Sequence, residues 1–196
     1  HSEAVGMNIA RLSAMKRAWI LSSWQIVPVR FPKLGEKVTI STWPYDFHGF
    51  FGYRNFTMTG EDGECLVYAM DTETGRPVKV DQEQEACFRI EEKFPMEYAD
   101  RKIRMPEETE ERESFQVAKH HLDINHHVNN AQYIKMAEEY LPEGFALKEM
   151  QTEYKKAAML HDVIVPRVAR EDGRLTVALT DAGGRPYAVV VFQEKQ

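Results

Sequence analysis

The sequence has few cysteines, no long apolar run and no excess of basic residues, and each absence argues against a class of protein. Its 196 residues include two cysteines, Cys65 and Cys87. They lack Cys-x-x-Cys spacing, so we expect buried thiols in a reducing compartment rather than a disulfide or a zinc site. Apolar runs such as 188–192 are far shorter than the roughly 18 residues of a membrane span. A formal net charge of −6 argues against bulk binding of nucleic acid.

Several catalytic signatures are missing as well. The sequence has no Gly-x-Ser-x-Gly nucleophile motif and no Gly-x-x-x-x-Gly-Lys-Ser/Thr phosphate loop.

No signal peptide is visible, although the chain begins with His1-Ser2-Glu3-Ala4 and no Met. We therefore expect a cytoplasmic protein, and we expect its first half to be incomplete at its start.

The residues that are present predict two similar halves. The first half has a helical apolar spacing over 2–20, followed by short β-branched or aromatic segments that are separated by Gly, Pro and Asp. These segments predict antiparallel strands at 24–29, 37–43, 53–59, 65–70 and 76–80. The second half predicts a strand at 115–119, a helix at 129–140, and strands at 150–157, 163–170, 175–181 and 187–193.

This repeated order predicts an α+β fold of the tandem, or double, hotdog type, in which each half is a helix wrapped by a curved antiparallel β-sheet. We expect an N-terminal hotdog at 1–95 and a C-terminal hotdog at 114–196. Residues 96–113 are rich in mixed charge and are predicted to be a charged linker. The alternative is that they form a solvated face of one continuous domain.

The stretch HHLDINHHVNN, 120–130, is the strongest candidate for a site, because it holds four of the seven histidines. If it is extended, Asp123, Asn125 and His127 point to one side, and Ile124 and His126 point to the other. A helix that begins at Val128-Asn129-Asn130 would present backbone N–H groups that can stabilise an oxyanion. Histidine accepts a proton near neutral pH, so activation of water by histidine is the simplest chemistry.

Two other interpretations of this stretch remain open. In the first, Asn129 or Asn130 merely caps the helix, and the histidines are surface or core residues without a catalytic role. The four histidines could also bind a metal, but no His-Glu-x-x-His motif or Cys pair supports this, and adjacent histidines on a strand point in opposite directions. We expect no metal.

The same stretch, with other segments, resembles the acyl-acyl carrier protein (ACP) thioesterase family. The pattern His-x-Asp-x-Asn-x-His-Val-Asn-Asn-x-x-Tyr, 121–133, is similar to the motif of that family's second half. Trp43-Pro44, the segment 49–56 and the turn 71–77 are similar to its first half, and Glu153-Tyr154-Lys155-Lys156 is similar to its Glu-Tyr-Arg-Arg segment. The resemblance covers nearly the whole chain.

The resemblance implies hydrolysis of a fatty acyl thioester on ACP without a cofactor. It implies His127 as the general base, Asn125 as the side chain that positions the thioester or the water, and Asp123 as the group that orients and polarises them. Backbone N–H groups of Val128, Asn129 and Asn130 would hold the oxyanion.

Plant members have a proposed catalytic glutamate and cysteine where this chain has Ala157 and Ala158. An acyl-CoA thioesterase of the hotdog class and a non-catalytic acyl-binding double hotdog are the alternatives.

The resemblance also implies sites for the substrate and its carrier. The first half would bind the acyl chain, and aromatic residues there could line a tunnel: Trp19, Trp24, Trp43, Phe50, Phe51 and Phe56. Trp43, Phe50, Phe51, Arg54 and Tyr133 are the substrate-contact candidates. An acidic ACP requires cations, which Lys155-Lys156, 101–104 or Lys16-Arg17 could provide. We expect no membrane or nucleic-acid partner, and a homodimer is allowed.

Overall fold

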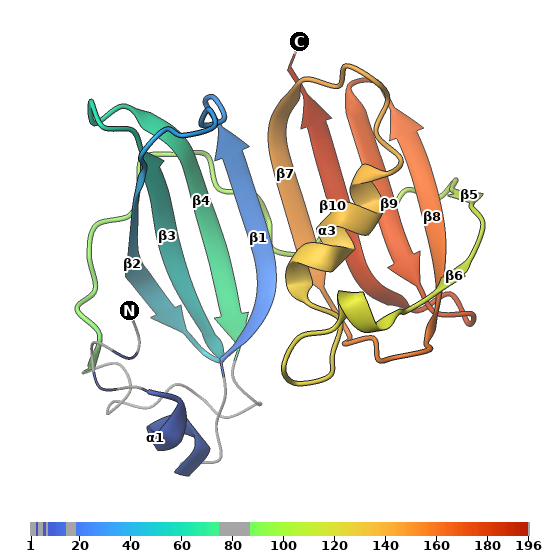
Figure 1. Cartoon of the computed structure of the whole chain (residues 1–196), viewed down its shortest axis with the longest axis horizontal. Coiled ribbons are helices and arrows are strands. Elements are labelled where there is room, and N and C mark those ends of the chain that lie inside the picture. The colour runs from blue at the N-terminus through green and yellow to red at the C-terminus, as the bar shows by residue number, and fades with distance from the viewer. Residues whose placement is uncertain (1–2, 4–5, 7, 15–18, 75–86, 196) are drawn as a thin grey trace. The chain divides into compact units, whose positions relative to one another are not determined.

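The computed structural model describes residues 3, 6, 8–14, 19–74 and 87–195. Its internal contacts divide the chain into two compact units, His1–Ala99 and Asp100–Gln196. Each unit is built mainly from an antiparallel sheet (Figure 1). The predicted strand 76–80 and the basic pair Lys16-Arg17 lie outside the described residues.

The described residues of the first unit form four sheet strands in the order β2-β3-β4-β1. Its strands are β1 (Ile20–Pro28), β2 (Thr39–His48), β3 (Phe51–Thr59) and β4 (Cys65–Thr74), close to the four predicted positions. A tight turn at Gly49 joins β2 to β3, and its φ of 63° favours glycine. The described helix is α1 (Ile9–Ala14). The predicted helix 2–20 was too long, because Ile20 already begins β1.

A segment from Phe88 to Ala99 crosses the first sheet and is bound to three of its strands. Trp43 of β2 donates from its indole nitrogen to the Glu92 carbonyl at 2.8 Å. On β3, the Asn55 carboxamide oxygen accepts from the Phe94 N–H at 3.1 Å and from the Tyr98 hydroxyl at 3.0 Å. On β1, Gln25 donates to the Glu97 carbonyl and accepts from the Ala99 N–H, both at 3.0 Å. These bonds pair both polar groups of the buried Gln25 carboxamide and the oxygen of the buried Asn55 carboxamide, and they fix the segment across the sheet.

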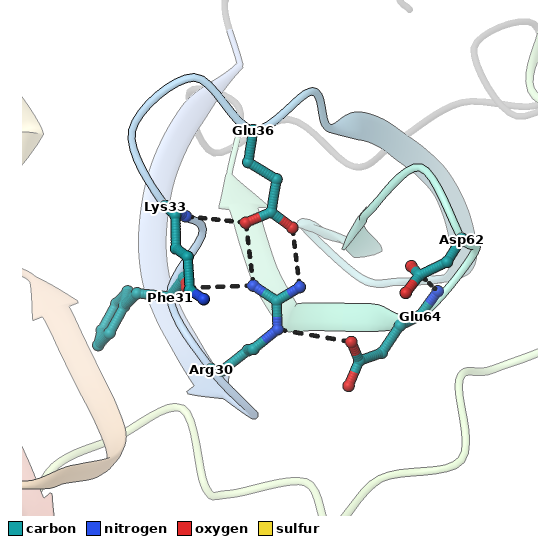
Figure 2. Close-up of polar contacts among 6 residues, drawn as sticks. All are labelled: Arg30, Phe31, Lys33, Glu36, Asp62 and Glu64. Carbon is teal, nitrogen blue, oxygen red and sulfur yellow. Dashed lines mark hydrogen bonds and ion pairs between the residues drawn. The ribbon is translucent and has the colours of Figure 1, made fainter.

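The loop between β1 and β2 is closed by an ionic cluster around Arg30 (Figure 2). The Arg30 guanidinium donates to both Glu36 carboxylate oxygens, at 2.8 and 3.0 Å, and Glu64 lies 3.4 Å from its Nε. The Lys33 N–H also donates to Glu36, at 2.8 Å. The Arg30 hydrogen bonds, followed by the Lys33 N–H, lower the pKa of Glu36 to about 2.

This cluster predicts an acid-dependent contribution to stability. The folded-state pKa of Glu36 is lowered, so its contribution is present above the ordinary carboxyl value of 4.5 and is lost as the pH falls towards 2. We expect Glu36→Gln to lower the melting temperature above pH 4.5 and to melt increasingly like the wild type towards pH 2. Thermal unfolding of both proteins across that range is the measurement. Glu61→Gln, which changes a more exposed partner of Lys37, is the control. A difference that does not depend on pH would contradict the assignment.

The second unit contains a sheet in the order β7-β10-β9-β8-β5. Its strands are β5 (Glu110–Glu111), β7 (Leu147–Tyr154), β8 (Val163–Glu171), β9 (Arg174–Thr180) and β10 (Pro186–Glu194). The short strand β6 (Phe115–Gln116) pairs with β8 and leads to the 3₁₀-helix η1 (Lys119–His121). The predicted strands 115–119 and 150–157 were therefore too long at their ends, because η1 and a turn after Tyr154 replace them.

The helix α3 (Asn130–Glu138) lies across one face of this sheet (Figure 1). It buries Tyr133, Met136 and Ala137. Ile103 packs with Ala178, Val189 and Val191 of the sheet, together with Met105. Every residue of β10 from 187 to 192 is buried, which explains its unbroken apolar run. Part of the segment predicted as a linker thus supplies core and edge-strand residues to the second unit.

Candidate active site

The histidine-rich stretch forms a tight turn between Leu122 and Val128, which pair as an antiparallel bridge. The Asp123 N–H donates to the His127 carbonyl at 2.8 Å, and the His126 N–H donates to the Asp123 carbonyl at 3.1 Å. His126 has a φ of 61°. The predicted extended arrangement of 123–127 was therefore wrong, and the alternation of side chains does not apply. The chain forms a turn here, because aspartate and asparagine side chains bond to nearby backbone groups and so compete with strand formation.

The Asp123 carboxylate holds this turn together. Its Oδ1 accepts from the Asn125 N–H at 2.8 Å and from the His127 N–H at 3.2 Å. Both contacts fix the backbone of residues predicted to be catalytic, and their side chains remain exposed. The structure thus brings Asp123, Asn125 and His127 together in one turn, where Asp123 sets the backbone geometry of the other two.

The turn leads directly into α3. Asn129 is the N-cap, and its side-chain oxygen accepts from the Ala131 N–H at 2.9 Å. The Val128 N–H donates to the Ala158 carbonyl, and the Asn129 N–H donates to the His121 carbonyl, both at 2.9 Å. Two of the three backbone donors expected to hold an oxyanion are therefore bound to carbonyls. Asn130, the first helical residue, lies where a helix N-terminus carries partial positive charge.

A loop at 157–162 packs against the same turn. His127 pairs with Met159 in an antiparallel bridge, next to the bond between Val128 and Ala158. The Asp162 carboxylate accepts from the Met159 N–H at 2.9 Å, which fixes the loop from the other side. Ala157 and Ala158 are therefore placed beside the candidate catalytic turn. No sequence pattern indicated the part played by Asp162.

Tyr133 links the helix to this loop. Its side chain is 2% exposed, and its hydroxyl accepts from the Ala158 N–H at 2.8 Å. Burial raises the pKa of Tyr133 to about 12, so the hydroxyl is neutral at physiological pH. Tyr154 similarly donates its hydroxyl to the Asn130 carbonyl at 3.1 Å. Both tyrosines come from segments that resembled the family, and here their hydroxyls bond to the backbone of residues next to the candidate site.

The neighbouring histidines have their own contacts. The His121 Nδ1 accepts from the Ala118 N–H at 3.0 Å, and the His120 and His121 rings lie 4.1 Å apart. Burial, and then the charge of His120, lowers the pKa of His121. His121 also lines a groove of about 340 Å³ beside α3, with Phe115, Met136 and Tyr140. Within the described part of the chain, no group of three His, Cys, Asp or Glu side chains could hold a metal ion.

The other substrate-contact candidates lie in the first unit. Trp43 is bound to Glu92 and packs against Phe94 at 6.4 Å between ring centroids. Arg54 is 8% exposed and donates to the Thr42 hydroxyl at 3.3 Å. Phe50 is 41% exposed, and Phe51 packs against Tyr53. Of the remaining tunnel candidates, Trp24 packs with Phe56, and Trp19 packs with Phe47 and Phe88.

Comparison with protein families assigns both halves of the chain. The model of the acyl-ACP thioesterase N-terminal domain matches residues 1–98, and that of the C-terminal domain matches residues 104–181. The chain belongs to the acyl-ACP thioesterase family. It is therefore a thioesterase of the kind that hydrolyses fatty acyl-ACP, and the predicted family and activity are confirmed. Comparison with curated protein sequences found no match.

Solved structures confirm the tandem hotdog fold of this thioesterase. An acyl-ACP thioesterase from Bacteroides thetaiotaomicron matches with a TM-score of 0.89 at 20% identity, over 100% of this chain and 84% of that one. The 12:0-ACP thioesterase from Umbellularia californica matches with a TM-score of 0.82 at 16% identity, over 100% and 84%. A MaoC-like dehydratase from Phytophthora capsici matches with a TM-score of 0.63 at 13% identity, over 91% and 72%. The fold thus also occurs in proteins named for other reactions.

None of the helices in the described residues is long and apolar enough to span a membrane.

Proposed function

We propose that His127 is the general base for hydrolysis of the thioester. It would take a proton from a water whose oxygen attacks the acyl carbonyl, and the proton would then pass to the departing thiolate, releasing the free fatty acid and the thiol. The observation that carries this proposal is the turn pinned by Asp123, which exposes the His127 side chain directly before the N-terminus of α3. Positioned general-base catalysis of this kind is worth about 10² to 10⁴-fold in rate.

The neighbouring groups would complete the site. Asn125 would position the thioester or the water. Asp123 would orient the turn and polarise Asn125 and His127. The Asn130 N–H and the N-terminus of α3 would stabilise the oxyanion, since the Val128 and Asn129 N–H groups are bound to carbonyls. No cofactor enters this scheme. Trp43, Phe50, Phe51, Arg54 and Tyr133 remain our proposed substrate contacts, and the first half would bind the acyl chain.

A panel of thioesters tests this function. We expect release of fatty acid from acyl-ACP across a series of chain lengths, with a higher kcat/KM than for acyl-CoA of the same chain. Higher turnover of acyl-CoA would favour a hotdog acyl-CoA thioesterase. Binding of acyl-ACP without hydrolysis would favour a non-catalytic acyl-binding protein, which the alanines at 157 and 158 make worth testing.

We also propose that ACP docks through charge. Both ACP and this chain are acidic overall, and this chain carries a formal charge of −6, so docking would require a local basic surface. Raising the salt concentration from 0.1 to 1 M shortens the Debye length from about 10 to about 3 Å. The KM for acyl-ACP is therefore expected to rise several-fold over that range, as measured by initial rates. A constant KM would contradict electrostatic docking.

For the setting of the enzyme we propose the cytoplasm, where its two thiols would stay reduced. We propose no nucleic-acid or membrane partner, and a homodimer as the assembly to test. Gel filtration with light scattering would measure the last of these directly.

A further inference from the structure

The end of the second sheet that carries the candidate active site also carries a pair of cations. The register of the strands places Tyr154, Val163, Thr180 and Pro186 at one end of the sheet. The connection from β7 to β8 reaches the turn that leads into α3, because Met159 pairs with His127. In Figure 1 the turn between β9 and β10 lies at the same end of the sheet. Lys156 and Arg185 belong to these two connections; Lys156 was one of several cations suggested above for docking ACP, and Arg185 was not assigned a role.

Both cations are held by a single carboxylate. The Lys156 ammonium lies 3.3 Å from Asp181 Oδ2, and the Arg185 Nε lies 3.2 Å from the same atom. The Asp181 Oδ1 accepts from the backbone N–H groups of Gly183 and Arg185, at 2.9 and 3.0 Å. The bond from the Arg185 N–H, with the other donors, lowers the pKa of Asp181. The carboxylate is thus ionised, fixed by the turn between β9 and β10, and shared by two positive charges.

The surface of this cluster is cationic although its centre is anionic. The Asp181 side chain is 12% exposed, whereas those of Lys156 and Arg185 are 49% and 81% exposed. Each cation has further N–H donors beyond the one that faces Asp181. Because both reach the same oxygen atom, their charged groups lie close enough for one anion to contact both. Lys156 is further fixed by lying 4.8 Å from the centroid of the Tyr187 ring.

The cluster is joined to the active site through a short stretch of backbone. Lys156 and Ala158 are two residues apart, or about 7 Å along an extended chain. Ala158 accepts from the Val128 N–H at 2.9 Å, and the next residue, Met159, pairs with His127. A molecule long enough to follow this stretch would place an anionic group on Lys156 and Arg185 at one end and approach His127 at the other.

We propose that Lys156 and Arg185 form a subsite for the phosphate of a phosphopantetheine arm, the group that carries the acyl thioester. The inference rests on the proposed function, since it places the thioester carbonyl at His127. A phosphodiester is a compact anion that suits two converging cations, one of them a guanidinium with several donors in a plane. The same phosphate chemistry is present in the arm of ACP and in coenzyme A.

Matched substrates test the subsite. We would measure the KM for acyl-phosphopantetheine and for acyl-pantetheine, with the same acyl chain, in the wild type and in Lys156→Gln/Arg185→Gln. We expect the double variant to raise the KM roughly three- to tenfold for the phosphorylated substrate alone. The control is Arg174→Gln, at the far end of β9 about 20 Å away. No selective increase, or an equal increase in the control, would overturn the proposal.

Binding of the arm alone separates this inference from the proposed function. Titration of the wild type with phosphopantetheine and with pantetheine should show tighter binding of the first, and the double variant should lose the difference. That result would support the subsite even if no thioester were hydrolysed. Normal hydrolysis with no preference for phosphopantetheine would refute the subsite and leave the function intact.

Two carriers distinguish the source of the charge. A similar rise of KM for acyl-ACP and acyl-CoA in the double variant supports recognition of the shared phosphate. A rise confined to acyl-ACP would overturn it, because the cations would then contact acidic side chains of the carrier. Circular dichroism and melting temperature of each variant would confirm that the fold is unchanged.

Discussion

Replacing His127 by alanine is expected to lower kcat for acyl-ACP by about 10² to 10⁴-fold, with little change in the melting temperature. The imidazole would take the proton from water, and the remaining site has no other group assigned to that step. The side chain is exposed, so its loss leaves no cavity. Steady-state kinetics and thermal unfolding of the purified variant are the measurements. Near wild-type turnover in a folded His127→Ala protein would refute the assignment.

Two neighbours serve as internal comparisons for this variant. Asn125→Ala should reduce kcat by a similar order if its amide positions the reacting group. His126→Ala should do little, because the His126 side chain is exposed and its left-handed backbone follows from the turn rather than from its imidazole. A large loss in His126→Ala with a small one in His127→Ala would exchange the roles of the two histidines.

Replacing Asp123 by alanine is expected to damage both stability and catalysis. The change removes the acceptor for the Asn125 and His127 N–H groups, which should cost about 1–2 kcal/mol in the free energy of unfolding. Loss of the turn would also displace the side chains of Asn125 and His127, which we propose to be catalytic, and a displacement of about 1 Å can cost 10²-fold in rate. Chemical denaturation and kcat/KM on acyl-ACP would measure the two effects.

Asp123→Asn separates the two roles of this residue. An amide oxygen can still accept from both N–H groups, so we expect stability close to that of the wild type. If the charge of Asp123 polarises the catalytic set, kcat should nevertheless fall. Wild-type kinetics in Asp123→Asn would limit Asp123 to holding the turn, and unchanged stability in Asp123→Ala would show that the turn does not depend on it.

The sequence predicted the strands well because their patterns are local. Short β-branched segments between Gly and Asp turns located β1 to β4 and β7 to β10, and the helix predicted at 129–140 corresponds to α3. The unbroken apolar run of β10 could not show that both of its faces are covered. That depends on Ile103, which packs on the sheet from a segment whose composition is mostly charged.

The geometry predicted for the candidate site differs from the one in the structure. Asp123, Asn125 and His127 were expected to converge by alternating along an extended chain, whereas they share a turn. The pattern could not reveal this, because the choice depends on the bridges to Leu122 and Met159, and Met159 lies more than thirty positions away. The sequence also could not show that the Tyr133 hydroxyl accepts from the Ala158 N–H. Nor could it show that Asp181 pairs with both Lys156 and Arg185, which lie in different connections.

The segment 88–99, which crosses the first sheet, determines where a chimaera of this enzyme and a relative should be joined. A chimaera joined after residue 95, where the sequence first indicates a boundary, would separate Gln25 and Asn55 from their own partners Glu97, Tyr98 and Ala99. Both amides are buried, so a foreign segment would have to supply the same donors and acceptors at the same places. A junction at residue 99 or 100 leaves these pairs within one parent, and is the better point of exchange for testing whether the first half sets acyl-chain specificity.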